Sequence, residues 1–175
     1  MNYVWNYEKV ETNVPSPQEK YSDPIEIQAL TSGETANLQY KFVWMKDGWK
    51  KWGVIQGLSK KPSAQWEPKE EGKYTILVDV QDQDGKTFPK SLEYEITKVN
   101  WKFDEINLSP EESQKKGKPI NITAVASGNI NKLQYKFVWM KDDWKEWGVI
   151  KSFSEDNTSV WTAPNKSGNY KILID

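Results

Sequence analysis

Four tryptophans occur as two pairs with the same spacing, and their indole rings are the side chains of this sequence best suited to contact a ligand. Trp49 and Trp52 are three residues apart, and Trp144 and Trp147 repeat that spacing 95 residues further along the chain. An exposed indole can stack on a sugar ring or anchor a partner protein. These four residues are therefore candidate ligand-binding residues; the simpler alternative is that they cover a neighbouring strand or the adjoining domain.

The spacing of each pair also predicts where the rings point. Residues three apart on one strand face opposite sides, so we expect one tryptophan of each pair to be inward and the other outward. The other tryptophans that alternate with polar residues are expected in the core: Trp5, Trp44, Trp66, Trp101, Trp139 and Trp161.

Acid–base and nucleophilic chemistry has few side chains available. The sequence has no His and no Cys, which excludes a Ser-His-Asp triad, a Cys-His pair and the common zinc sites. The carboxylates that remain fall in turns and on outward strand positions, and no pair stands out as a glycosidase pair would. We therefore expect a protein that is not an enzyme and has no cofactor.

One acidic loop has a spacing that suggests calcium. Asp79, Asp82 and Asp84 are spaced like a loop that could hold Ca²⁺ through oxygen ligands, but they lack the ligand number and the glycine placement of an EF-hand. A polar hairpin turn is the simpler interpretation, so no metal site is predicted.

Charge and hydropathy exclude two further classes of partner. Lys and Arg total 24 against 25 Asp and Glu, a formal charge of −1, so the chain lacks the basic footprint of a nucleic-acid-binding protein. No apolar run approaches the ~18 residues of a membrane span. Neither nucleic acid nor a membrane is an expected partner.

The candidate residues lie in a segment that the chain repeats. Residues 38–55 read LQYKFVWMKDGWKKWGVI, and residues 133–150 differ from them at only two of 18 positions, Gly48 against Asp143 and Lys51 against Glu146. Leu38, Tyr40, Phe42 and Trp44 alternate with other residues, as in a strand with one face in a core. An Asp-Gly turn suited to positive φ then predicts a hairpin. Because the second copy has Asp-Asp there, we expect a turn longer or looser than two residues.

The repeat predicts two domains, residues 1–98 and 99–175, because about 95 residues can bury a core of their own. Each begins with a strand, residues 1–10 and 100–106, and continues with a second, residues 25–30 and 120–125. Residues 72–80 and 168–175 are β-branched and expected to be central strands. About seven short strands and no helical period indicate an all-β fold of two tandem immunoglobulin- or fibronectin type III-like antiparallel β-sandwiches. The short connection between them predicts restricted relative motion.

The first domain has a last strand at residues 91–97 that the second lacks. An open edge beside residues 170–175 would recruit a strand, so we predict a strand-exchange dimer through the incomplete second domain, or a frayed one.

The first copy resembles the triple-tyrosine-motif domain, also called the three-Y domain of two-component regulators. The resemblance rests on four segments: Tyr40-Lys41-Phe42, Trp49, residues 72–78 and Asp84-Gly85. The second copy matches at residues 135–137, 144 and 168–170. The family's second tyrosine is a phenylalanine in both copies, which removes a hydroxyl. The resemblance implies a fibronectin-like sandwich of the kind found in sensor kinases and in tandem arrays of Gram-positive, particularly clostridial, surface proteins, some of which carry cell-wall amidase domains.

Three hypotheses follow. The leading one is a non-catalytic spacer and interaction element of an exported or cell-surface protein of a Gram-positive bacterium, in contact with other domains of its parent protein. The second is a carbohydrate- or peptidoglycan-binding module that uses the four tryptophans on a cell-wall glycan, or that anchors a surface protein. The third is a dimerising extracytoplasmic part of a sensor kinase.

Overall fold

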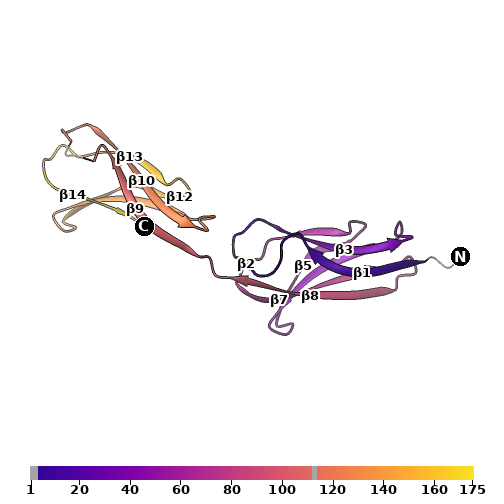
Figure 1. Cartoon of the computed structure of the whole chain (residues 1–175). Coiled ribbons are helices and arrows are strands. Elements are labelled where there is room, and N and C mark those ends of the chain that lie inside the picture. Colours follow the sequence, from indigo (N-terminus) through magenta and orange to yellow (C-terminus); the bar gives the residue numbers. More distant parts are fainter. Residues whose placement is uncertain (1–3, 112–113) are drawn as a thin grey trace. The chain divides into compact units, whose positions relative to one another are not determined.

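The structure is a computed structural model that describes residues 4–111 and 114–175, and it shows two compact units, Met1–Val99 and Asn100–Asp175. Every regular element in the described ranges is a β-strand (Figure 1). None of these residues forms a helix that is long and apolar enough to cross a membrane.

Unit 1 is a sandwich of two sheets. A three-stranded sheet has the order β1-β3-β6, and a five-stranded sheet has the order β2-β8-β7-β4-β5. Their bounds are β1 Trp5–Thr12, β2 Gln18–Glu19, β3 Ile25–Gly33, β4 Gln39–Lys46, β5 Lys51–Ser59, β6 Ser63–Trp66, β7 Gly72–Gln81 and β8 Thr87–Thr97. All pairings are antiparallel except that of the two-residue strand β2 with β8. The first three residues of the predicted strand 1–10 lie outside the described ranges.

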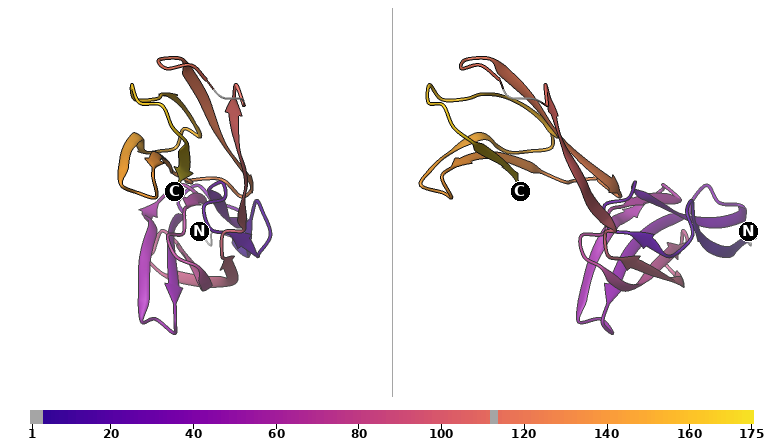
Figure 2. Two further views of the ribbon diagram at one scale, coloured as in Figure 1. Left: turned by 90° about the vertical axis from the view of Figure 1, so that its left-hand side faces the viewer. Right: turned by 60° about the vertical axis from the view of Figure 1, so that its left-hand side comes forward.

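Unit 2 repeats this plan with fewer strands. Its sheets have the orders β13-β10-β9 and β12-β11-β14, and they lie on opposite sides of the unit (Figures 1 and 2). The bounds are β9 Trp101–Ser109, β10 Pro119–Gly128, β11 Tyr135–Lys141, β12 Glu146–Ser154, β13 Thr158–Thr162 and β14 Tyr170–Ile174. The expected all-β fold of two antiparallel sandwiches is confirmed.

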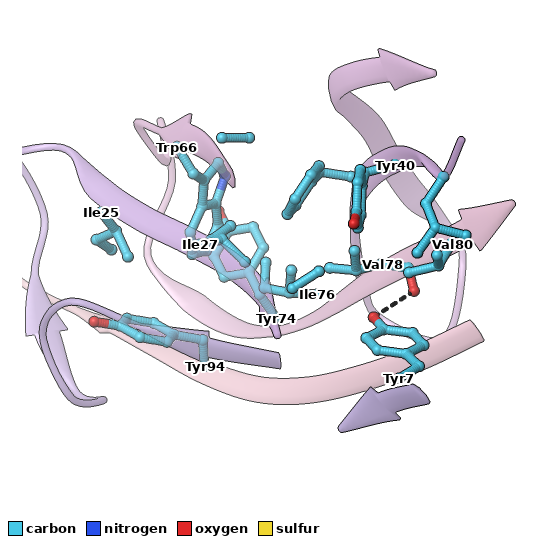
Figure 3. Close-up of a cluster of buried hydrophobic side chains, with 14 of the residues drawn as sticks. Tyr7, Ile25, Ile27, Tyr40, Trp66, Tyr74, Ile76, Val78, Val80 and Tyr94 are labelled. Atoms are coloured by element: carbon cyan, nitrogen blue, oxygen red, sulfur yellow. Dashed lines mark hydrogen bonds between the residues drawn. The ribbon is translucent and has the colours of Figure 1, made fainter. Parts of the chain in front are cut away.

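The core of unit 1 lies between its two sheets. Alternate residues of β3 and β7, such as Ile27 and Ile76, are fully buried, as the two-residue period of a strand requires. Figure 3 shows the aromatic rings that fill the space between them. Tyr7 donates its hydroxyl to the carbonyl oxygen of Val78 at 3.0 Å, which supplies the partner that a buried hydroxyl needs.

The strand at residues 72–81 is central in unit 1, but its counterpart in unit 2 is not. β7 lies between β4 and β8, whereas β14 pairs only with β11 among the described residues. The prediction of a central strand at 168–175 was therefore wrong. Ile172 and Ile174 are consequently half-buried, while Ile76 and Val78 of β7 are fully buried.

Candidate binding surface

The turn of each hairpin holds its first tryptophan in an unusual backbone conformation. β4 and β5 are joined by residues 47–50, of which Asp47, Gly48 and Trp49 all have positive φ, 53°, 62° and 70°. Unit 2 keeps this geometry at residues 142–144, with φ between 51° and 71°. The longer turn expected from the sequence is confirmed. A left-handed conformation costs a residue such as tryptophan roughly 1–2 kcal/mol, so the chain retains a strained, outward ring in both units.

The predicted orientation of the tryptophan pairs was wrong. Trp49 and Trp144 are not on strands but in the turns, so the alternation rule does not apply to them. All four rings are exposed, with exposed fractions of 54% for Trp49, 59% for Trp52, 49% for Trp144 and 58% for Trp147. The hairpin tip that carries Trp49 projects beyond the rest of its sheet (Figures 1 and 2).

The neighbouring residue Gly53 explains why Trp52 faces outward. A Cβ added at Gly53 would lie 2.6 Å from Nε1 of Trp44, so the inward Trp44 ring lies directly against this glycine. Successive residues of a strand alternate between the faces of its sheet. Trp52 and Val54, on either side of the inward Gly53, must therefore point to the outer face.

The outer face of the five-stranded sheet carries an apolar surface. Residues paired across antiparallel strands share a face, and Met45 pairs with Trp52 while Val43 pairs with both Val54 and Leu77. We call this surface, completed by a neighbouring leucine, the hairpin patch of unit 1: Val43, Met45, Trp52, Val54, Leu58 and Leu77. Val43 and Met45 are buried, yet neither belongs to the core cluster of the unit. They are therefore covered by their neighbours in a second apolar cluster outside the sandwich.

Unit 2 has the same patch at equivalent positions. Met140 pairs with Trp147, and Val138 pairs with both Val149 and Leu173. The hairpin patch of unit 2 consists of Val138, Met140, Trp147, Val149, Phe153 and Leu173. Val138 is buried but lies outside the core cluster of unit 2. Both units therefore carry an apolar surface on the outer face of the sheet that contains the hairpin.

Ion pairs hold the base of each hairpin. In unit 1 the carboxylate of Glu70 accepts hydrogen bonds from Nζ of Lys51 at 3.0 Å and of Lys46 at 3.3 Å. These bonds hold the pKa of the Glu70 carboxyl below its usual value, since they stabilise the charged form, and the Lys51 pKa is raised in turn. The contact joins the first residue of β5 to the loop before β7.

Unit 2 makes the same contact with its charges reversed. Glu146 stands where unit 1 has Lys51, and Lys166 stands where it has Glu70, and the two bond at 3.1 Å. The equivalence of the loop positions is shown by two tyrosines, since Tyr74 donates to the carbonyl oxygen of Glu70 and Tyr170 to that of Lys166. One of the two differences within the repeat is thus compensated by a second difference outside it.

The other tryptophans and the acidic turn at residues 82–84 are not part of the patches. Trp66 and Trp161 are buried, and Trp5, Trp44 and Trp139 are half-buried against the cores. Trp101 is exposed on β9, so its prediction as a core residue was wrong. The Asp82 carboxylate accepts the backbone N–H groups of Asp84 and Lys86, which makes the acidic loop a hairpin turn. Within the described ranges no three acidic residues are grouped to hold a metal ion.

Sequence reasoning missed the aliphatic part of the patches. The signal was present, because Val43 and Met45 make β4 apolar on both faces, and the second copy repeats them. A strand with apolar residues on both faces is expected to have both faces covered by other side chains, so the outer face of β4 could have been recognised as part of a second apolar cluster.

No protein-family model matches the chain, and no curated protein matches its sequence. The resemblance to the triple-tyrosine-motif domain therefore stays a prediction. Solved structures do match. The fibronectin(III)-like modules of CbhA from Clostridium thermocellum are 18% identical, with a TM-score of 0.38, over 94% of this chain and 83% of theirs.

Two further structures are similar at the same level. A carbohydrate-binding module of the β-sandwich superfamily is 15% identical, with a TM-score of 0.35, over 97% of this chain and 84% of its own. SGBP-B of the Bacteroides ovatus mixed-linkage glucan utilization locus, in complex with a mixed-linkage heptasaccharide, is 11% identical, with a TM-score of 0.36, over 95% of this chain and 43% of its own. Likenesses this distant do not bear on the ligand of this chain.

Proposed function

We propose that the chain is a non-catalytic binding module that attaches its parent protein to a polysaccharide of the bacterial cell surface through the two hairpin patches. One observation carries the proposal: each unit keeps the same apolar surface, with an outward tryptophan, on the face of its sheet that points away from the core. Residues that only stabilise a sandwich belong between its sheets.

The duplication favours a polymer over a folded protein as the ligand. A polysaccharide presents the same sugar unit many times, so one polysaccharide molecule can occupy both patches, and its affinity for the protein is then higher than for a single patch. The patches match a sugar chain in chemistry too, because exposed indole rings and aliphatic side chains pack against the apolar faces of sugar rings. The repeated strain at Trp49 and Trp144 is consistent with a binding role, since strained residues cluster at functional sites.

The experiment is co-sedimentation of the full chain with purified Gram-positive cell walls and with insoluble neutral polysaccharides. The variant Trp52→Ala/Trp147→Ala should bind about 30-fold more weakly, because truncation of a central tryptophan in an interface costs about 2 kcal/mol or more. Trp49→Ala/Trp144→Ala tests the turn residues in the same way.

The matched control is Trp101→Ala, which removes another exposed tryptophan outside both patches and should bind as the unmodified chain does. Absence of sedimentation above background would refute the polysaccharide proposal and leave the spacer role with protein partners. Equal losses in the control and the patch variants would show that the patches are not the site.

A further inference from the structure

We propose that the hairpin patch of unit 1 continues into a hydroxyl-binding subsite, built around Lys41 and Asp79, which selects neutral over charged polysaccharides. This inference rests on the proposed function and names the class of ligand. The subsite is a hollow of about 330 Å³ lined by Lys41, Leu58, Asp79, Gln81 and Thr87.

The hollow lies on the same face of the sheet as the patch. Lys41 pairs with Asp79 across β4 and β7, and Gln81 pairs with Thr87 across β7 and β8. Along β4, Lys41 is two residues from Val43 and four from Met45, which places all three on one face. Leu58 belongs to the patch and also lines the hollow, so the two surfaces are continuous.

The dimensions suit an extended ligand. The four residue steps along β4 from Met45 to Lys41 span about 13 Å at roughly 3.3 Å per residue. This is room for more than one sugar ring. One end of the surface is apolar, at Trp52 and Met45, and the other end is polar, at Lys41 and Asp79. A sugar chain along β4 would place ring faces on the indole and hydroxyl groups in the hollow.

The two charged groups of the hollow are free to take such a ligand. Lys41 and Asp79 lie opposite each other, yet neither makes a side-chain hydrogen bond or an ion pair within the part of the chain that the structure describes. An ammonium only donates hydrogen bonds and a carboxylate only accepts them. The hollow adds the Thr87 hydroxyl and the side-chain amide of Gln81, of which Nε2 also donates to the carbonyl oxygen of Gly85 at 3.3 Å. Lys41 and Asp79 thus supply the donor and the acceptor that neighbouring sugar hydroxyls require.

The charges of the hollow determine the class of ligand. The charges of the Lys41 ammonium and the Asp79 carboxylate sum to zero. A neutral, hydroxyl-rich polysaccharide can therefore form hydrogen bonds with both groups without adding an unpaired charge. An anionic polysaccharide would instead bring its carboxylates against Asp79, and like charges at close range disfavour binding.

Unit 2 repeats the pair at the same place. Lys136 and Asp175 lie opposite each other and exchange two backbone hydrogen bonds, of 2.9 and 3.0 Å. Nζ of Lys136 lies 5.8 Å from the ring centroid of Phe153, the residue equivalent to Leu58. The association of this charged pair with the patch therefore occurs twice.

The test uses the full chain with Trp144→Ala/Trp147→Ala as background, so that binding reports on unit 1. The probes are hydroxyethylcellulose and laminarin, which are neutral, and polygalacturonate, which is anionic, in affinity electrophoresis. In this background Asp79→Asn and Lys41→Gln should each weaken binding to at least one neutral probe about 10-fold, the effect of losing one charge-assisted hydrogen bond. Asp84→Asn, in the exposed turn beyond the hollow, should have no effect.

Selectivity provides a readout that a purely structural role would not move. Asp79→Asn should increase the binding of polygalacturonate relative to the neutral probes, while Lys41→Gln should decrease it. Neutral-probe binding that is unchanged in both variants but lost in Trp52→Ala would overturn the subsite and leave the proposed function intact. If the unmodified protein binds a neutral probe but the Trp144→Ala/Trp147→Ala background binds none, the assignment of the subsite to unit 1 is overturned. Binding of no polysaccharide by the unmodified chain would overturn both proposals.

Discussion

Substitution of Gly53 by alanine tests the geometry on which the hairpin patch of unit 1 depends. The new Cβ would lie 2.6 Å from Nε1 of Trp44, and also within 3 Å of two ring carbons, whereas ordinary contacts begin at 3.4 Å. The indole must therefore move. Its edge-on contact with Tyr74, at a centroid distance of 5.6 Å, would be disturbed in the same step.

We expect Gly53→Ala to lower the free energy of unfolding of unit 1 by about 2 kcal/mol, within the range of about 1–3 kcal/mol observed when a packed core is overfilled. For a unit of about 100 residues this corresponds to a decrease in Tm of about 8–16 °C. Differential scanning calorimetry of the full chain measures it. Unit 2 has a separate core and provides an internal reference.

Gly57→Ala is the matched control, because it lies on the same strand and its Cβ would meet no atom within 4 Å. That variant should be as stable as the unmodified chain, or slightly more stable, since alanine reduces the freedom of the unfolded chain. Equal stability of the two variants would show that Trp44 does not lie against Gly53. The outward orientation of Trp52 and Val54 would then lose its basis.

Three further predictions concern single contacts. Tyr7→Phe removes the buried hydroxyl that bonds the Val78 carbonyl oxygen and should destabilise unit 1 by about 1–2 kcal/mol in urea unfolding; no change would show that this hydroxyl contributes nothing. The pKa of Asp156 is lowered to about 2 by hydrogen bonds from Lys151 and Thr158, so the stabilisation is complete above the ordinary pKa of 3.8 and is lost as the pH falls through about 2. An NMR titration should place the midpoint there and shift it upward in Lys151→Gln, whereas an unchanged midpoint in that variant would contradict the assignment. A synthetic peptide with the sequence of β8, residues 87–97, should pair with the unpaired side of β14 and shift the amide signals of Tyr170 and Ile172, as edges of sheets accept strands; shifts confined to other residues would refute this.

The repeat and the two-residue period were sufficient to predict the fold. The alternation that includes Tyr40 and Phe42 predicted the inward face of β4, and the hairpin followed from its Asp-Gly turn. The central position predicted for β14 failed because a β-branched sequence reports burial but not the number of neighbouring strands. Which strands pair is a property of the whole unit.

The candidate site was predicted less completely. The four tryptophans were candidates from the sequence, and binding by them stays a prediction. Their orientation was predicted wrongly because the rule for strands was applied across a turn boundary at Trp49. The role of Gly53 in seating Trp44 is a tertiary contact that spacing alone does not reveal. The partnership of Lys41 with Asp79 depends on register between strands that are distant in sequence.

The charge reversal at the base of the hairpins bears on how the chain folds. Because the two hairpins differ at only two of 18 positions, either of them fits the core of either unit, and adjacent similar domains are prone to exchange segments while they fold. In an exchanged pairing, Lys51 would meet Lys166 and Glu146 would meet Glu70, so both contacts would become repulsive. The charge at the base of each hairpin is therefore complementary only to the loop of its own unit. The reversal thus disfavours an exchange of hairpins between the units, which the nearly identical core-facing residues of the two hairpins would otherwise permit.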